Sequence, residues 1–298
     1  MSTKLLLSAL FPDSPYFGGM TGGIQGFPLR HVFMAETINK LAQTIPRINL
    51  LEVGSWTGSS VLTWSQAIAE FCPEGSSVLC VDPWTPYFDV KDKASDGHYH
   101  NMNILSDLEL SYNLFLHNIQ FAAKGVKVSH FRGTSTDVLP FLTEGSFDLI
   151  YLDGSHYLDN VRFDLAEADR LLKDGGILCG DDLELKGDEC DLEFAMAHTD
   201  SDFIKDPKTG IEFHPGVTVA VHEKFPVVSS YGGYWVMRKY NAKFENVHLD
   251  HSTVFVPSHF PQNIKADVLE KLKAFVGSET EIKSLHKALL STSYQNQV

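Results

Sequence analysis

Two stretches of the chain decide its fold, Tyr151-Leu-Asp-Gly-Ser-His-Tyr157 and Gly175-Gly-Ile-Leu-Cys-Gly-Asp-Asp182. In each of them an apolar run typical of a buried strand leads directly into carboxylates. Ionised carboxylates at the ends of buried strands are costly to desolvate unless a positive charge lies between them. Asp153, Asp181 and Asp182 therefore indicate a site for a hard cation, which prefers oxygen ligands. The alternative is that Asp181 and Asp182 only cap a helix or end a strand.

Strands and helices alternate along the rest of the chain. Apolar residues at helical spacing predict a helix over 29–45, which Pro46 ends. The other predicted helices are 59–71 and 158–172, and the predicted strands are 48–54, 77–82, 126–131, 147–153 and 176–181. Continuous apolar strands separated by helices indicate a parallel sheet with both faces covered.

The last part of the predicted sheet is different. Residues 227–231 and 234–238 are two apolar runs separated by Gly232-Gly233, which predicts a β-hairpin. One antiparallel strand then closes a parallel sheet, whereas an ordinary dinucleotide-binding sheet would end parallel. The expected fold class is therefore α/β: a Rossmann-like, seven-stranded, mostly parallel sheet with a terminal antiparallel hairpin and helices on both faces.

Composition excludes several classes of protein. The formal net charge of the 298 residues is -14, and no Lys/Arg run could follow a phosphate backbone, which argues against nucleic acid as a partner. No stretch reaches the roughly 18 apolar residues that cross a membrane. The short apolar run 4–11, stopped by Pro12, predicts a packed element rather than a signal peptide. No CxxC pair is present, and Cys80 and Cys179 lie in predicted buried strands, which indicates reduced thiols and a cytoplasmic protein.

We expect three segments along the chain. Residues 1–46 form an N-terminal helical segment that covers the site, 47–240 form the core, and 241–298 form a C-terminal helical extension. The extension would pack on the outside of the core or on a second copy of the chain. The sequence therefore leaves open whether the chain forms a homo-oligomer. Within the core, 84–111 is an insertion with aromatic and histidine residues and little periodicity, which we expect to act as a lid.

Glu52-Val-Gly-Ser-Trp-Thr-Gly58 stands at the phosphate-loop position of a nucleotide-binding fold but lacks the spaced glycines of G-x-G-x-x-G. Trp56 lies where the backbone would approach a pyrophosphate. A ligand without phosphates, such as S-adenosylmethionine, needs only glycine beside its methionine part and an acid for its ribose hydroxyls. Asp82 ends the second strand and could be that acid, although Asp82-Pro83 could also simply end the strand.

Taken together, these motifs resemble the macrolide sugar (macrocin-type) O-methyltransferases, a group of class I methyltransferases, and the related cephalosporin-hydroxylase-like proteins. The resemblance runs in order over residues 48–240, through Glu52–Ser60, Val81–Trp84, Arg132–Ser135, Leu152–His156 and Gly175–Asp182. It implies an S-adenosylmethionine site and a magnesium site made by Asp153, Asp181 and Asp182. The residues that the resemblance implies for the cofactor are Glu52, Gly54, Ser55, Gly58, Ser59, Asp82, Trp84, Thr134, Ser135 and Asp153.

The expected chemistry agrees with this resemblance. Methyl transfer from a sulfonium needs an aligned and deprotonated acceptor oxygen, and a divalent metal lowers the pKa of a bound hydroxyl. Three carboxylates without a soft ligand favour magnesium over zinc. Several sugar-modifying relatives have a further acid where this chain has Ser155, so the resemblance does not identify the catalytic base. Two roles of His156 are open. His156 could be the catalytic base beside Asp153, or it could hydrogen-bond the loop or orient Asp153. His214 could also face the acceptor pocket, but a turn residue is the favoured interpretation.

The sequence thus predicts a magnesium-dependent O-methyltransferase that moves a methyl group from S-adenosylmethionine to a hydroxyl of a small polar acceptor, a sugar or a glycosylated metabolite. One alternative is a non-catalytic nucleoside-binding or scaffold protein of the same fold. A nicotinamide-dependent oxidoreductase is a second alternative, which Trp56 and the terminal hairpin disfavour.

Overall fold

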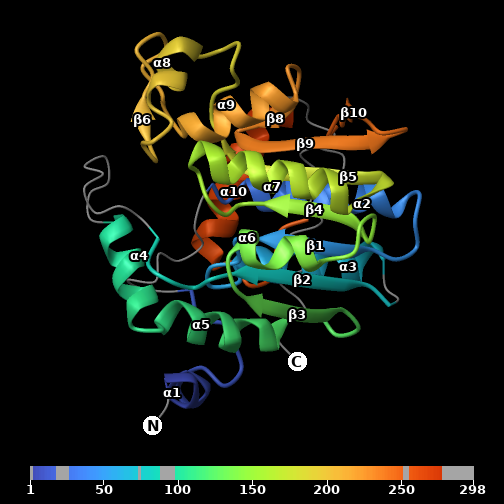
Figure 1. The fold of residues 1–298 in the computed structure, drawn as a ribbon. Helices are drawn as coiled ribbons and strands as arrows, with labels where there is room; N and C mark the ends of the chain where they lie inside the picture. Colours follow the sequence, from blue (N-terminus) through green and yellow to red (C-terminus); the bar gives the residue numbers. More distant parts are fainter. Residues whose placement is uncertain (1–2, 18–26, 73–74, 88–97, 251–254, 277–298) are drawn as a thin grey trace.

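The computed structural model describes residues 3–17, 27–72, 75–87, 98–250 and 255–276 (Figure 1). Its centre is one eight-stranded sheet in the order β10-β9-β5-β4-β1-β2-β3, with β8 paired to β9 beside β10. The strands of this sheet are β1 (Asn49–Val53), β2 (Ser77–Asp82), β3 (Lys127–Arg132), β4 (Phe147–Leu152), β5 (Leu172–Leu183), β8 (Ser229–Tyr231), β9 (Gly233–Tyr240) and β10 (Lys243–Asn246). Two short strands, β6 (Ile204–Lys205) and β7 (Glu212–Phe213), pair separately.

Continuous apolar sequence explains the centre of the sheet. β4 is buried along its whole length, and β1 pairs in parallel with both β2 and β4. Alternate residues serve the two faces: Leu50 and Leu149 belong to one hydrophobic cluster, Leu51 and Ile150 to the other. The carboxyl ends of β1, β2 and β4 therefore meet at one edge, where ligands of open α/β sheets bind.

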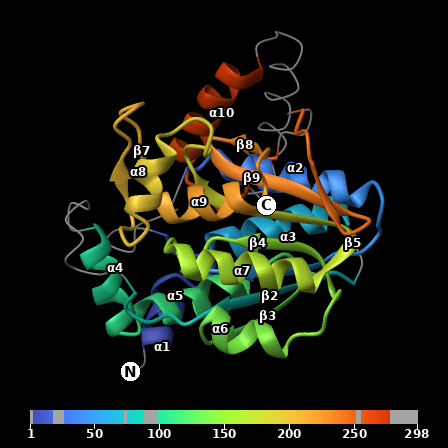
Figure 2. The same ribbon diagram turned by 45° about the horizontal axis from the view of Figure 1, so that its top comes forward.

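Helices cover both faces of the sheet. One cluster packs α2 (Arg30–Ala42), α3 (Ser59–Phe71) and α10 (Gln262–Val276) on one face, and the other packs α7 (Leu158–Leu171) and α9 (Pro215–Lys224) on the opposite face. The remaining helices are α1 (Thr3–Leu10), α4 (His98–Asp107), α5 (Leu110–Asn118), α6 (Ser135–Val138) and α8 (Leu192–Ala197). Figure 2 shows α4 and the α8–β7 region on the side where the parallel strands end. None of the helices in the described ranges is long and apolar enough to span a bilayer.

The predicted fold class is confirmed, including the β8–β9 hairpin, whose second strand runs antiparallel to β5. The four cysteines are buried and free, in agreement with the prediction of reduced thiols. The extension after residue 240 differs from the expectation, because it begins with the additional strand β10 before α10. The part of the expected helical extension after residue 276 lies outside the described residues.

The insertion contains more regular structure than its sequence indicated. Residues 98–107 form α4, and α5 begins at Leu110, while 88–97 lie outside the described residues. The apolar period is hidden in α5 because Ser111, His117 and Asn118 are buried together with its leucine and phenylalanine side chains. Asn118 is satisfied there by donating to the carbonyl oxygens of Tyr16 and Thr57.

Candidate functional site

A cavity of about 340 Å³ opens at the carboxyl ends of β1, β2 and β4. Several residues that the sequence predicted for cofactor binding line it, namely Gly54, Asp82, Trp84, Thr134, Ser135 and Asp153. The insertion, which the sequence had placed near the site, contributes Tyr87, Met102, Asn103 and Ser106 to the lining. Asn160 and Asp164 of α7 also line the cavity, and the sequence did not indicate these two. The cavity has a volume typical of small-molecule sites.

The glycine loop after β1 is held tightly. Gly54 has φ +87°, and a Cβ there would lie 1.9 Å from the carbonyl oxygen of Asp153, so only glycine lets β1 and β4 meet in this way. Asp82 fixes the same loop from β2: its Oδ2 accepts the N–H groups of Ser55 and Trp56, both at 2.9 Å. Its Oδ1 accepts the N–H of Trp84 at 2.6 Å. Asp82 therefore organises the loop as well as lining the cavity.

Four of the predicted cofactor residues lie outside the cavity lining: Glu52, Ser55, Gly58 and Ser59. Glu52 is fully buried and accepts hydrogen bonds from Ser55 Oγ at 2.7 Å and from Trp64 Nε1 at 3.2 Å. Gly58 has φ +89° and precedes α3, and Ser59 Oγ contacts His259 Nε2 at 3.2 Å. These residues support the glycine loop from the side that faces away from the cavity.

Burial raises the pKa of Glu52 to about 7, against hydrogen bonds from Ser55 and Trp64 that lower it. The folded state thus keeps a proton that the unfolded state releases near its ordinary pKa, so this contribution to stability is present at low pH and is lost as the pH rises through about 7. Between about pH 5 and pH 8, we expect the free energy of unfolding to fall by on the order of 3 kcal/mol more in the wild type than in Glu52→Gln. Urea unfolding at several pH values measures this difference. Parallel curves for the two proteins would mean that Glu52 does not titrate in this range.

The three predicted metal ligands are brought together. One carboxylate oxygen from each of Asp153, Asp181 and Asp182 lies within 4.8 Å of the others. Consecutive residues of a regular strand point to opposite faces, but the β5–β9 register shifts between Gly180 and Leu183, and Asp182 has φ 64°. This bulge allows two adjacent carboxylates to join the same cluster, which we call the acid trio.

A positive charge that the sequence reasoning missed already lies in the acid trio. Arg30, at the start of α2, is buried, and its Nη1 pairs with Asp181 Oδ2 and lies 3.3 Å from Asp153 Oδ2. Tyr151 also donates its hydroxyl to Asp153 Oδ2 at 3.0 Å. Little in the sequence indicated Arg30, because α2 also contains the charged residues Glu36 and Lys40.

The members of the acid trio differ in their protonation. Burial raises the pKa of Asp153 well above its usual range and that of Asp181 to about 6, although Arg30 lowers both. Burial also acts on Asp182, but the neighbouring His156 and His214 outweigh it and hold the pKa of Asp182 below its usual range. One guanidinium therefore does not neutralise the acid trio, and two of its members tend to keep protons.

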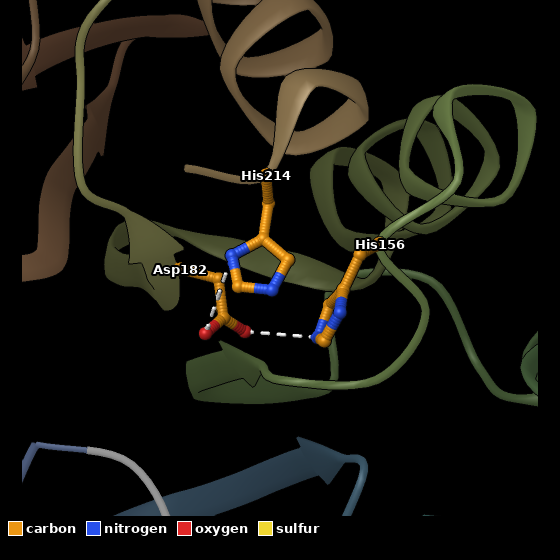
Figure 3. A group of neighbouring side chains, drawn as sticks. All are labelled: His156, Asp182 and His214. Carbon is orange, nitrogen blue, oxygen red and sulfur yellow. Dashed lines mark ion pairs between the residues drawn. The ribbon is translucent and has the colours of Figure 1, made fainter. Parts of the chain in front are cut away.

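Two imidazoles lie beside Asp182 (Figure 3). His156 Nε2 is 3.0 Å from Asp182 Oδ2, and its Nδ1 is 2.8 Å from Asp202 Oδ1. The contact of His156 is thus with Asp182, whereas the sequence had suggested Asp153. His214, expected to be a turn residue, immediately precedes α9 and is buried, and its ring centroid lies 4.3 Å from that of His156.

The start of the insertion closes over the loop after β4. Tyr87 has its hydroxyl 2.9 Å from Ser155 Oγ and accepts the N–H of His156 at 3.0 Å. Ser155 thereby lines the cavity at the position where several relatives have an acid. The insertion contributes directly to the site through Tyr87 and through Met102, Asn103 and Ser106 of α4.

The chain is similar to known methyltransferases. Residues 51–183 match the family model described as "Methyltransferase domain", which confirms the methyltransferase part of the resemblance drawn from the motifs. Among solved structures, the chain is similar to an O-methyltransferase from Bacillus cereus in complex with SAH (16% identity, 78% of this chain and 86% of that chain, TM-score 0.42). It is also similar to the calicheamicin methyltransferase CalS11 (16% identity, 79% and 91%, TM-score 0.45) and to the O-methyltransferase NovP (14%, 72% and 80%, TM-score 0.48). No curated protein sequence matched.

Proposed function

We propose that this chain, which is similar to the methyltransferase-domain family over residues 51–183, is a metal-dependent O-methyltransferase that uses S-adenosylmethionine. The acceptor that we propose is a hydroxyl of a small polar molecule, a sugar or a glycosylated metabolite. One observation carries the proposal: Asp153 lines the cavity beside the glycine loop and also belongs to the acid trio. A methyl donor in the cavity and an acceptor at the acid trio would therefore be neighbours.

The donor set of the acid trio fits a hard divalent cation. All three donors are carboxylate oxygens, and Arg30 supplies one positive charge against three acids. Burial raises the pKa of Asp153 and Asp181, so a second cation there would favour their ionised form. Magnesium bound there would lower the pKa of the acceptor hydroxyl and fix its position.

We assign the other residues by their contacts. Asp82 shapes the glycine loop and offers its carboxylate to the ribose hydroxyls, with Thr134 and Ser135 lining the same cavity. Tyr87 and Ser155 form the part of the cavity wall that the acceptor would pass on entering. Of the two roles open to His156, its contacts support positioning of a metal ligand, here Asp182, because both ring nitrogens face carboxylates. His156 lines a small hollow beside the acid trio and not the larger cavity.

The experiment that tests the proposal combines binding with turnover. Calorimetry should show S-adenosylhomocysteine binding in the presence of EDTA, because the glycine loop and Asp82 lie apart from Asp181 and Asp182. With labelled S-adenosylmethionine and a panel of sugar nucleotides and glycosides, EDTA should stop methyl transfer and Mg²⁺ should restore it. Replacing Asp153, Asp181 or Asp182 with alanine should abolish transfer. The Asp181 and Asp182 variants should keep cofactor binding nearly intact, because neither residue lines the cavity. Transfer that continues in EDTA would exclude the metal mechanism, and cofactor binding without any transfer would favour the non-catalytic alternative.

Asp82→Ala should weaken S-adenosylhomocysteine binding by about 1.5–3 kcal/mol, or roughly 10- to 150-fold in Kd, through loss of a charge-assisted hydrogen bond. Calorimetry measures the affinity, and thermal unfolding reports the separate loss of the three backbone hydrogen bonds that Asp82 accepts. Asp159→Ala is the matched control, because that carboxylate on α7 is 94% exposed and does not line the cavity. An Asp82 variant with unchanged affinity would remove Asp82 from the cofactor site.

A further inference from the structure

We propose that His156, His214 and Asp182 bind a divalent transition-metal ion at a second site, next to the oxygen-only acid trio. One ligand atom from each of the three residues lies within 4.8 Å of the others. They come from three segments, the loop after β4, the end of β5 and the residue before α9 (Figure 3). Asp182 is shared with the acid trio, so the two sites are adjacent.

Both imidazoles are oriented in the way that metal-bound histidines usually are. His156 Nδ1 lies 2.8 Å from Asp202 Oδ1, and His214 Nδ1 lies 3.0 Å from Glu184 Oε1. A carboxylate at Nδ1 fixes the tautomer that carries its proton there and leaves Nε2 as the ligand atom. Each histidine thus has a carboxylate at Nδ1, and the Nε2 of each ring is the atom that would bind the ion. His214 Nδ1 also lies 3.9 Å from Asp182 Oδ1, which places this ring beside the third ligand.

The two Nε2 atoms are placed accordingly. His156 Nε2 faces Asp182 Oδ2 at 3.0 Å. His214 Nε2 is buried and has no hydrogen-bond partner among the residues that the structure describes; it lies 4.0 Å from Asp202 Oδ2. A buried ring nitrogen without a partner is unfavourable, and a bound ion would satisfy it.

The backbone holds the two histidines together without the ion. Gly216, in the first turn of α9, packs directly on the loop that carries His156, since a Cβ at this glycine would lie 2.2 Å from the His156 carbonyl oxygen. The Phe203 ring covers His214, with centroids 4.6 Å apart. The site is therefore preformed, which lowers the ordering cost of binding.

The donor set selects the class of ion. Two imidazole nitrogens and one carboxylate suit Zn²⁺, Co²⁺, Fe²⁺ or Mn²⁺, whereas Mg²⁺ prefers oxygen ligands throughout. The carboxylates of Asp202 and Glu184 supply further negative charge around the ion. With the ion on Nε2 and Asp202 on Nδ1, His156 has no nitrogen left to accept a proton, so it would not be a general base.

The test is a Co²⁺ titration of the full chain, freed of metal and then kept in about 10 mM Mg²⁺ so that oxygen-only sites are filled, with visible absorption as the readout. We expect one Co²⁺ per chain, with affinity reduced at least about 100-fold in His156→Ala and in His214→Ala. His198→Ala is the matched control, because its Nδ1 contacts the Phe194 carbonyl oxygen outside the site, and it should bind like the wild type. Asp153→Ala, which removes a ligand of the acid trio only, should also keep the Co²⁺ spectrum.

Wild-type protein that does not take up Co²⁺, or a His214→Ala variant that binds it as well as the wild type, would overturn the proposal. If the alanine variants fail to fold, Glu184→Gln decides, because it keeps the shape of the side chain and should lower Co²⁺ affinity about 10- to 100-fold. An unchanged affinity in that variant would likewise count against the site. Because no step of the test uses methyl transfer, its result is independent of the function proposed above.

Discussion

Replacing Arg30 with methionine should lower the free energy of unfolding by about 3–5 kcal/mol, because the variant leaves Asp153 and Asp181 buried without their guanidinium. Urea unfolding in EDTA measures the loss. Arg162→Met is the matched control: its pair with Glu223 joins two side chains that are 46% and 44% exposed, and it should cost less than about 1 kcal/mol.

Adding Mg²⁺ makes this prediction specific to the acid trio. Since a bound cation stabilises the folded state by mass action, Mg²⁺ should stabilise Arg30→Met more than it stabilises the wild type, in which Arg30 already engages two of the three carboxylates. Equal stabilisation of the two proteins would mean that Arg30 and the ion do not share these carboxylates. If Arg30→Met lowers the free energy of unfolding by less than about 1 kcal/mol in EDTA, the carboxyl groups are protonated or solvated and do not need the guanidinium for stability.

Gly54→Ala should destabilise the fold by at least about 4 kcal/mol, because its Cβ would lie 1.9 Å from backbone atoms of β4's loop at a φ of +87°. Gly175→Ala separates the steric overlap from the cost of the positive φ. Gly175 also has a positive φ, +82°, but nothing lies within 4 Å of its Cβ position, so only the conformational cost of about 1–2 kcal/mol applies. Thermal and urea unfolding of both variants measure the difference.

Similar losses in the two glycine variants would contradict the close approach of β1 and β4, and would leave backbone conformation as the reason for glycine at 54. S-adenosylhomocysteine binding should fall in Gly54→Ala even where the protein still folds, because the loop that lines the cavity must move. Gly175→Ala should bind like the wild type, since Gly175 lies outside the cavity lining.

The sequence was sufficient for β1 to β5 and for the β8–β9 hairpin, because each of these strands could be recognised locally, whereas β10 was missed. The apolar runs that became β1, β2 and β4 are continuous, and Gly232-Gly233 marks the β8–β9 turn. The acid trio was predictable for the same reason: carboxylates that follow neighbouring parallel strands meet at one edge.

The remaining features of the site depend on contacts between distant segments, which no local pattern encodes. Arg30 reaches Asp181 across 151 positions in sequence, and His214 meets His156 only because α9 packs on the loop after β4. Glu52 was expected at the cofactor, but a buried strand end does not reveal which way its carboxylate points, and Ser55 and Trp64 hold it behind the loop. α5 was missed because its buried face is partly polar.

The contact between Gly54 and the backbone of Asp153 has a thermodynamic consequence. The loop that would hold the methyl donor and a ligand of the acid trio touch through main-chain atoms, so neither can shift without the other. If donor binding changes the affinity for the cation by some factor, the cation must change the affinity for the donor by the same factor. Donor binding and cation binding would then be coupled whichever comes first. A chain that holds one of the two ligands would bind the other more tightly, or more weakly, than the empty chain does.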